Sequence, residues 1–133
     1  MRLLWQTLCY LDTNVIIDYL RGRPEAGQYM NTLGAAEVLI SAITVAELYG
    51  GVREGAERTQ LDTFISQFEI VPIETEIARK AGLYRRDYGK SHSTETADAL
   101  IAATAELRQA TLITLNKKHF PMLTNVIVPY QRA

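Results

Sequence analysis

Short apolar runs alternate with longer helical patterns along the whole chain. The apolar runs predict buried strands at residues 8–11, 38–40, 68–73, 111–115 and 125–128. The stretches between them have the spacing or composition of helices, at residues 15–20, 25–34, 44–48, 56–67, 74–88 and 94–109. Strands that alternate with helices are typical of an α/β domain. We therefore expect a central, mostly parallel sheet of four or five strands with helices on both faces.

Length and composition favour one ordinary globular domain. Of the 133 residues, 47% are apolar and 22% are charged, both close to globular averages. No internal repeat, low-complexity tract or Pro/Gly-rich linker divides the chain. We expect a single domain over residues 1–133, with its motifs between about residues 8 and 128.

Charge and cysteine content exclude several classes of protein. The chain has 14 Lys and Arg against 15 Asp and Glu, which excludes a strongly basic nucleic-acid binder. A nuclease stays open, because local patches matter more than net charge. The single cysteine, Cys9, excludes an intrachain disulfide and a Cys-rich zinc site, and it favours the cytoplasm. No apolar run reaches the roughly 18 residues of a membrane span, and the N-terminus is no convincing signal peptide.

Asp12 directly follows the first predicted strand. Ligands of open α/β sheets bind at the carboxyl ends of strands, so polar residues at these ends are the candidates for chemistry. Asp12 has two interpretations. It is a good N-cap for the next helix, or it is a rigidly held metal ligand, with Thr13 and Asn14 supplying hydrogen bonds around it.

Glu47 also has two interpretations. Thr44 and Glu47 have the spacing of a capping box, with Glu47 at the third position of the helix. The same position in the first turn places its carboxylate on the strand-end side of the sheet. A Glu that folds back onto the backbone has fewer free oxygens, so the two roles are only partly compatible.

Asp98 is the carboxylate that is hardest to explain by structure alone. It stands near the start of an Ala- and Leu-rich helix, and its neighbours three, four and seven positions on are apolar. We therefore expect it on the apolar face of the helix. A lone carboxylate that faces a core is costly unless it is paired or bound to a metal.

The fourth predicted strand ends in polar residues. Taken alone, Thr114 is an ordinary strand residue and Asn116 an ordinary turn residue. Lys117, Lys118 and His119 follow as a short basic loop. If the strand ends converge, Asn116 joins the carboxylates and the lysines lie beside them.

Three converging carboxylates would repel one another, and a divalent cation is the usual resolution. Oxygen donors select Mg²⁺ or Mn²⁺ rather than zinc. Such an ion lowers the pKa of a bound water and neutralises charge on phosphate oxygens. Asp12, Glu47 and Asp98 therefore favour the hydrolysis of a phosphodiester, with one or two ions.

Four segments in order resemble the PIN-domain family, and within it the VapC-type toxin ribonucleases. They read YLDTNVIID at residues 10–18, SAITVAELYGG at 41–51, ADALIAATA at 97–105 and LITLNKKHF at 112–120. The resemblance implies an Mg²⁺-dependent endoribonuclease, with Mn²⁺ able to substitute, that is the toxin of a type II toxin–antitoxin system. It also implies inhibition by a cognate VapB-type antitoxin, homodimers, and a higher assembly with the antitoxin.

The family motifs carry over to particular residues of this chain. By the match to the family's acidic positions, Asp12, Glu47 and Asp98 would be the catalytic core, with Asp12 and Asp98 as direct metal ligands. Thr13 and Thr114 match supporting positions. The family often has a fourth acid where this chain has Asn116, or a few positions on, where it has His119. That departure leaves an alternative, a catalytically degenerate PIN-like protein that binds RNA or an antitoxin without turnover.

Other residues have weaker functional interpretations. A basic stretch before the Asp98 helix is either a solvated face or a track for the RNA backbone. With Lys117 and Lys118, its members Arg85, Arg86 and Lys90 are the candidate RNA contacts. Asp18, two turns into the first helix, is expected to be exposed, and Trp5 is a candidate for a dimer seam.

Overall fold

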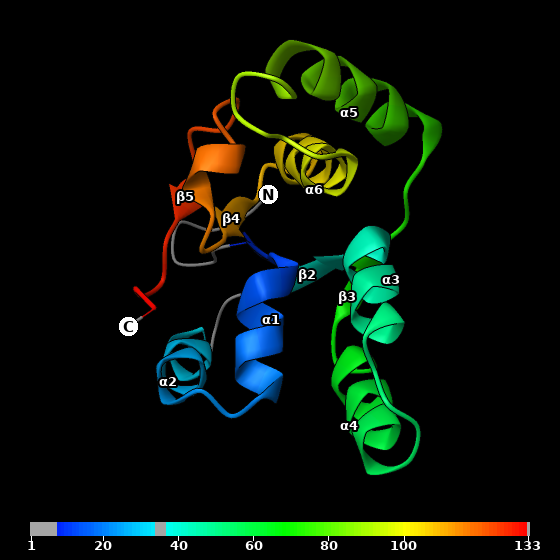
Figure 1. Cartoon of the computed structure of the whole chain (residues 1–133), viewed down its shortest axis with the longest axis vertical. Helices are drawn as coiled ribbons and strands as arrows, with labels where there is room; N and C mark the ends of the chain where they lie inside the picture. The colour runs from blue at the N-terminus through cyan, green and yellow to red at the C-terminus, as the bar shows by residue number, and fades with distance from the viewer. Residues whose placement is uncertain (1–7, 34–36, 133) are drawn as a thin grey trace.

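Five parallel strands form one sheet in the order β3-β2-β1-β4-β5 (Figure 1). The computed structural model describes residues 8–33 and 37–132, so Trp5 lies outside the described residues. The strands are β1 (Leu8–Leu11), β2 (Glu37–Ser41), β3 (Glu69–Val71), β4 (Thr111–Ile113) and β5 (Val126–Ile127). The expected parallel α/β sheet is confirmed, with five strands.

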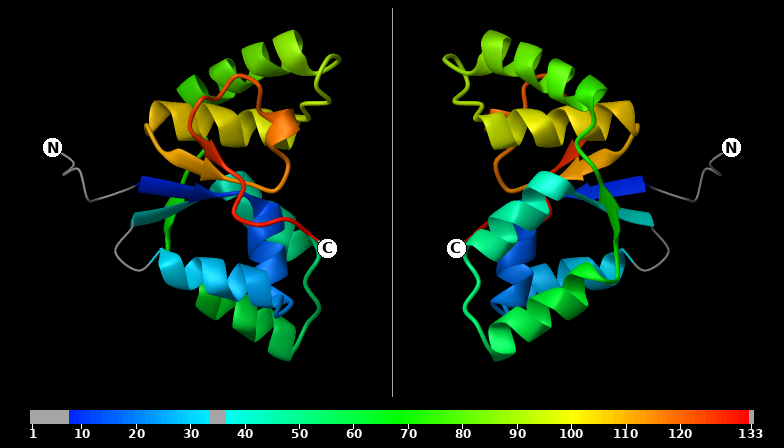
Figure 2. Two further views of the ribbon diagram at one scale, coloured as in Figure 1. Left: turned by 90° about the vertical axis from the view of Figure 1, so that its left-hand side faces the viewer. Right: turned by 90° about the vertical axis from the view of Figure 1, so that its right-hand side faces the viewer.

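Helices cover both faces of the sheet (Figure 2). Helices α5 (Thr75–Tyr88) and α6 (Thr96–Leu107) lie on one face, and α1 (Thr13–Leu20), α2 (Pro24–Thr32) and α4 (Ala56–Ile65) lie on the other. Helix α3 (Ala42–Gly50) continues from the carboxyl end of β2 and contacts α1, α4 and α6. Among the described residues, none of the helices combines the length and apolar character that crossing a membrane requires.

The central strand β1 is apolar at every position because both of its faces are buried. In β1, Leu8 and Tyr10 pack into the cluster under α5 and α6. Cys9 and Leu11 pack into the cluster on the α1 and α4 side. This alternation follows from the period of two residues along a strand. It explains why the sequence shows continuous apolar runs rather than alternating ones.

Helix α3 begins earlier than the sequence suggested. Its N-cap is Ser41, whose hydroxyl accepts the backbone N–H of Ile43 at 3.1 Å. The capping box of Thr44 and Glu47 is therefore wrong, because Ser41, at the end of β2, supplies the cap first. Glu47 lies in the second turn of the helix, where the backbone N–H groups do not require a side-chain acceptor.

Asp18 is buried in α1, so the expectation that it is exposed is wrong. Its relative accessibility is 1%. Arg132 donates to both carboxylate oxygens at 2.8 and 3.0 Å, and the Tyr130 hydroxyl donates at 2.9 Å. The Arg23 guanidinium lies 3.5 Å away. These partners make burial of the charge tolerable, and the two that donate hydrogen bonds, Tyr130 and Arg132, come from the far end of the chain.

Candidate active site

The site lies at the carboxyl ends of β1 and β4 (Figure 1). From β1 the chain builds outward to β2 and β3 on one side, and later to β4 and β5 on the other. A crevice at such a reversal of strand order is where open α/β sheets bind ligands. Asp12 follows β1 at this point, and its backbone N–H donates to the carbonyl of Ile113 at 3.0 Å.

Asp12 is held by hydrogen bonds to both carboxylate oxygens. Its Oδ1 accepts the Thr13 N–H at 2.8 Å, and its Oδ2 accepts the Thr114 hydroxyl at 2.7 Å and the Asn14 amide at 3.4 Å. Asp12 is also the N-cap of α1, as one of its two interpretations expected. The sequence had assigned Thr13 and Asn14 to hold this carboxylate, and both of them donate to it.

Burial raises the pKa of Asp12 to about 6. The side chain is only 5% exposed. The hydrogen bonds from Thr114 and Thr13 favour the charged form and lower the pKa, whereas the charges of Asp98 and Glu47 raise it. Asp12 is thus a buried acid whose acidic neighbours add to the cost of its charge.

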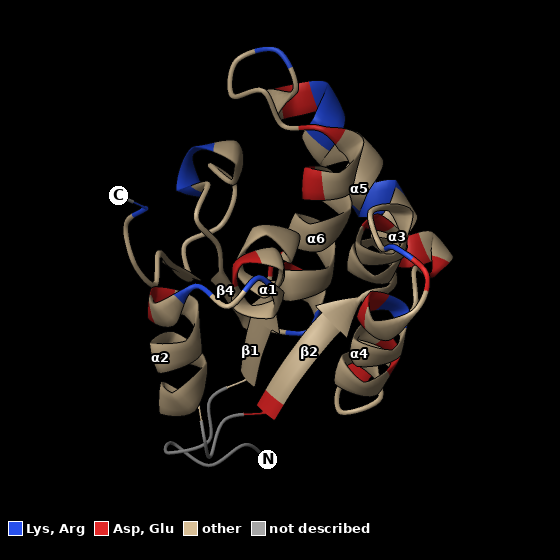
Figure 3. Cartoon of the chain, turned by 60° about the horizontal axis from the view of Figure 1, so that its bottom comes forward, with Lys and Arg blue, Asp and Glu red and all other residues tan. Residues whose placement is uncertain are grey.

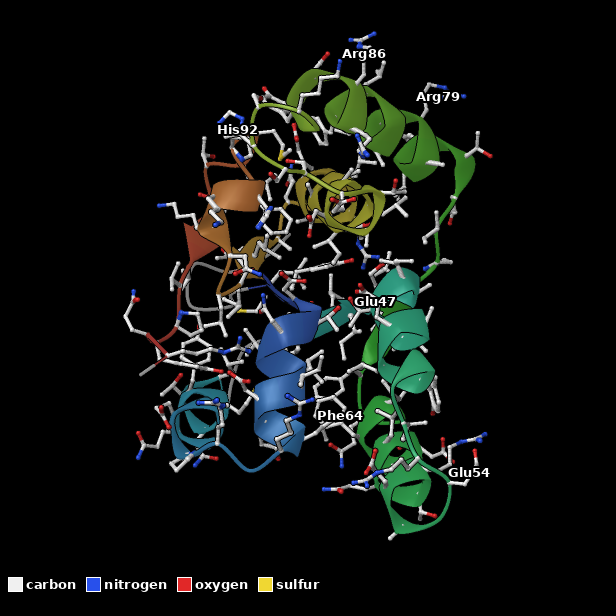
Figure 4. The ribbon with its side chains drawn as sticks, viewed as in Figure 1. Glu47, Glu54, Phe64, Arg79, Arg86 and His92 are labelled. Carbon is white, nitrogen blue, oxygen red and sulfur yellow. The ribbon has the colours of Figure 1, made fainter. Side chains whose placement is uncertain are left out.

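Glu47 reaches the site from α3 (Figure 4). Its Oε1 accepts the Thr13 hydroxyl at 2.6 Å. The same hydroxyl lies 3.2 Å from that of Thr44, which is fully buried beneath the site. The Glu47 side chain is otherwise exposed, so one face of its carboxylate is open to solvent. Thr44 was missed as a part of this network, because its polar residue type was explained by the cap.

Asp98 does not face the core as expected. Its side chain is 24% exposed. At the third position of α6, its Oδ2 accepts the backbone N–H of Glu95 at 3.1 Å. A short acid in the first turn can fold back onto the N-cap, so apolar neighbours further along the helix do not fix its direction. Partial burial raises the pKa of Asp98.

Thr114, Asn14 and Asn116 tie the end of β4 to the site. The Asn14 side chain accepts the Leu115 N–H at 3.3 Å, and its amide lies 3.5 Å from the Thr114 hydroxyl. Thr114 also accepts the Asn116 N–H at 3.1 Å. Asn116 itself is exposed, and its side chain does not cap the short helix η1 (Lys117–His119) that follows.

The candidate RNA contacts separate into two groups. Lys117 and Lys118 are exposed in η1, directly after Asn116. Arg85, Arg86 and Lys90 are exposed around the end of α5. Figure 4 shows Arg86 on the outer side of α5, far from Glu47, and Figure 3 shows acidic and basic residues mixed along α4 and α5. Lys117 and Lys118 thus follow the end of β4 directly, whereas Arg86 lies away from Glu47.

Comparison with known proteins gives the family. The PIN domain profile matches residues 9–122. Two ribonucleases of Mycobacterium tuberculosis, VapC19 and VapC10, are each 37% identical over 90% of this chain, and over 98% and 91% of their own lengths. A solved toxin–antitoxin complex from Klebsiella pneumoniae contains a chain with a TM-score of 0.81 and 31% identity, over 93% of this chain and 99% of that one.

The chain is a PIN-domain protein of the VapC group. Its matched region contains Asp12, Glu47 and Asp98, and it reaches past η1. The resemblance stated from the four sequence segments is therefore confirmed.

The carboxylate oxygens of Asp12, Glu47 and Asp98 have the chemistry that a hard cation prefers, but the three side chains are not close together. Among the described residues, no Lys or Arg forms an ion pair with Asp12, Glu47 or Asp98. No lysine or arginine therefore neutralises these charges, and the only basic group paired with them in the described residues is His119, 3.9 Å from Asp98 Oδ2. All of the carboxylate donor atoms are oxygens. Over residues 8–33 and 37–132, however, no three His, Cys, Asp or Glu side chains are gathered closely enough to hold a metal ion.

A cavity of about 570 Å³ opens beside Glu47, between α1, α3 and α4. Its apolar wall is formed by Ile17, Leu20, Leu48, Val52 and Leu61. Charged side chains lie around this wall, namely those of Arg21, Glu47, Arg53 and Glu57. A segment bound in this cavity would cover Glu47.

Proposed function

We propose that this protein is the toxin of a type II toxin–antitoxin pair, an endoribonuclease with Asp12, Glu47 and Asp98 as its catalytic residues. The observation that carries the proposal is the buried Asp12 at the switch point of the sheet, whose pKa is raised by burial and by the other two carboxylates. The VapC ribonucleases, 37% identical over most of this chain, support RNA as the substrate. We infer that the enzyme acts in the cytoplasm, where RNA is available.

We propose a divalent cation as the cofactor, Mg²⁺ or in its place Mn²⁺. When bound, the ion would supply an activated water and neutralise charge on the phosphate oxygens. Asp12 and Asp98 are the residues we assign to hold it. We assign Glu47, whose side chain is exposed, to orient the attacking water and accept its proton. Asn116 adds an oxygen without adding negative charge, so the proposal needs one ion rather than two.

The residues around the carboxylates position them. Thr13 fixes one oxygen of Glu47, while Thr114 and Asn14 fix one oxygen of Asp12. Lys117 and Lys118 are the best candidates for contacts to the RNA backbone, since they are exposed next to Asn116. Arg85, Arg86 and Lys90 are weaker candidates, because a part of their charge is balanced locally, as in the pair of Arg86 with Asp87 at 2.8 Å.

A VapB-type antitoxin is the proposed protein partner. The Klebsiella relative was solved as a toxin–antitoxin complex. The cavity beside Glu47 has the mixed apolar and charged lining that an amphipathic segment requires. A homodimer is proposed from the family resemblance alone.

The alternative, a degenerate protein that binds RNA or antitoxin without cleaving, has Asn116 as its main support. Expression in bacteria without an antitoxin separates the two. We expect the wild-type protein to arrest growth and Glu47→Gln to relieve the arrest. Glu76→Gln, the same change at an exposed position of α5, should leave the arrest intact. Normal growth of cells that contain folded wild-type protein would contradict the proposal.

A further inference from the structure

His119 and Thr94 form a pair of hydrogen bonds that joins η1 to the start of α6. The Nδ1 atom of His119 lies 2.9 Å from the Ser93 carbonyl oxygen. In return, the Thr94 hydroxyl donates to the His119 carbonyl at 2.8 Å. Because a carbonyl only accepts, Nδ1 must carry the proton of this hydrogen bond. We call these two hydrogen bonds the brace.

The brace is a built feature rather than a chance surface contact. Thr94 is 1% exposed, so its hydroxyl has no access to water. Ser93 has a φ of 54°, which is uncommon for a residue other than Gly, and this turn precedes the helix start. Phe120, next to His119, is buried in the same cluster as Ala99 and Ala102 of α6. The chain thus fixes η1 against α6 at three adjacent points.

The brace leads directly to Asp98. The backbone N–H of Glu95, next to Thr94, donates to the Asp98 carboxylate at 3.1 Å. His119 Nδ1 also lies 3.9 Å from Asp98 Oδ2. Among the three carboxylates, Asp98 alone is not held by the Thr13, Asn14 and Thr114 network. The position of Asp98 relative to Asp12 and Glu47 must therefore be fixed by the start of α6, the segment that His119 and Thr94 hold.

We propose that His119 is a positioning residue, which holds the start of α6 through the Ser93 carbonyl so that Asp98 stands in place for RNA cleavage. This inference rests on the proposed function. It differs from a role of His119 as an acid or a ligand, because it requires only a donor at the Nδ1 position. The same hydrogen bonds would also fix the position of η1, which carries Lys117 and Lys118, relative to Asp98.

Two substitutions of His119 separate the proposal from general packing. The side-chain amide of His119→Asn reaches the position of Nδ1, whereas that of His119→Gln reaches the position of Nε2. We expect His119→Asn to keep kcat within about threefold of wild type. His119→Gln should lose about ten- to a hundredfold in kcat with KM nearly unchanged, because a misplaced Asp98 affects the transition state most.

Thr94→Val tests the other half of the brace, and the chain offers a matched control. Thr104 lies within α6 and is fully buried, as Thr94 is before the helix. Its hydroxyl donates to the Leu100 carbonyl at 2.8 Å, the same distance as that from Thr94 to His119. Thr94→Val should lower kcat in the same direction as His119→Gln, and Thr104→Val should not. Equal kcat values for Thr94→Val and Thr104→Val, or for the two His119 variants, would overturn the proposal.

Hydrogen exchange gives a readout that needs no RNA. The backbone amides of residues 95–98 should exchange faster in His119→Gln than in His119→Asn, with the rest of the fold unchanged. Equal exchange of these amides in the two variants would show that the brace does not hold the start of α6. If the wild-type protein does not cleave RNA but these amides respond as expected, the proposed function fails and the brace stands.

Discussion

Asp12 combines two requirements that oppose each other in the absence of a cation. It must be fixed rigidly, which its burial and its hydrogen bonds achieve. It must also be charged to bind a cation, and burial, Asp98 and Glu47 all disfavour that charge. Because its pKa in the folded protein is about 6, above the ordinary 3.8, the folded state binds a proton there more tightly than the unfolded chain does.

This shift predicts how Asp12→Asn changes stability with pH. The stability that Asp12 contributes is fully present below pH 3.8 and is lost as the pH rises through about 6. The lost stability is about 3 kcal/mol by pH 8, since each pKa unit corresponds to roughly 1.4 kcal/mol. In the presence of EDTA, Asp12→Asn should therefore gain free energy of unfolding over wild type between pH 4 and pH 8.

Urea denaturation of both proteins across this pH range measures the difference. Groups other than Asp12 titrate in both proteins, so the difference curve isolates the Asp12 contribution. A difference that does not change with pH would show that the Asp12 pKa is not raised.

At the scale of elements, α1 is held at both ends. Asp12 caps its first turn, and near its last turn Asp18 accepts Tyr130 and Arg132 from the segment after β5. Burial opposes the charge of Asp18, but the hydrogen bonds from Arg132 and Tyr130 outweigh it and lower the pKa of Asp18. The segment after β5 therefore anchors the helix that carries the site, although it lies outside every sequence motif.

Removing Arg132 should destabilise the protein more than removing a surface partner. Arg132→Ala leaves a buried carboxylate short of its main partner, and we expect a loss of about 1–3 kcal/mol at pH 7. Arg86→Ala breaks an exposed pair with the same 2.8 Å separation, and it should cost under about 1 kcal/mol. Equal losses of the two variants in urea denaturation would mean that the Asp18 cluster is not a buried ion pair.

The sequence predicted the helices and strands better than their side-chain directions. The apolar runs located all five strands. The run was clearest for β1, which is buried on both faces. The expectation for Asp18 was wrong because its hydrogen-bond donors Tyr130 and Arg132 are more than 100 residues away in the chain. The capping-box interpretation of Glu47 was wrong because Ser41 caps α3, whereas its other interpretation agrees with the contact to Thr13. The expectation for Asp98 was wrong because its carboxylate folds back to accept the Glu95 N–H.

At the scale of the whole molecule, the strand order creates the site. Asp12 and Thr114 are 102 positions apart, yet they share a hydrogen bond of 2.7 Å, because β1 and β4 are neighbours in the sheet. The rule for strand ends made Asp12 a candidate, and the family resemblance gave Thr114 a supporting position, but the pairing of β1 with β4 was not predicted. The exact separations of the three carboxylates could not be predicted, since they depend on where each helix begins.

The net charge of −1 also bears on the whole molecule. A chain with this charge has no general attraction for RNA, so binding must come from a local patch such as Lys117 and Lys118. Their position beside Asn116 places this patch at the same edge as the carboxylates. In the proposed active site, one small basic turn and one acidic edge of the sheet would act together.

Cleavage of a mixed RNA pool by the purified, antitoxin-free protein tests this account most directly. The reaction is run with Mg²⁺, with Mn²⁺ and with EDTA, for the wild type, Asp12→Asn and the exposed control Asp87→Asn. The account predicts cleavage by wild type and Asp87→Asn with either metal, none with EDTA, and none by Asp12→Asn. Cleavage that survives EDTA or Asp12→Asn, or no cleavage of any RNA by the folded wild type with metal, would contradict it.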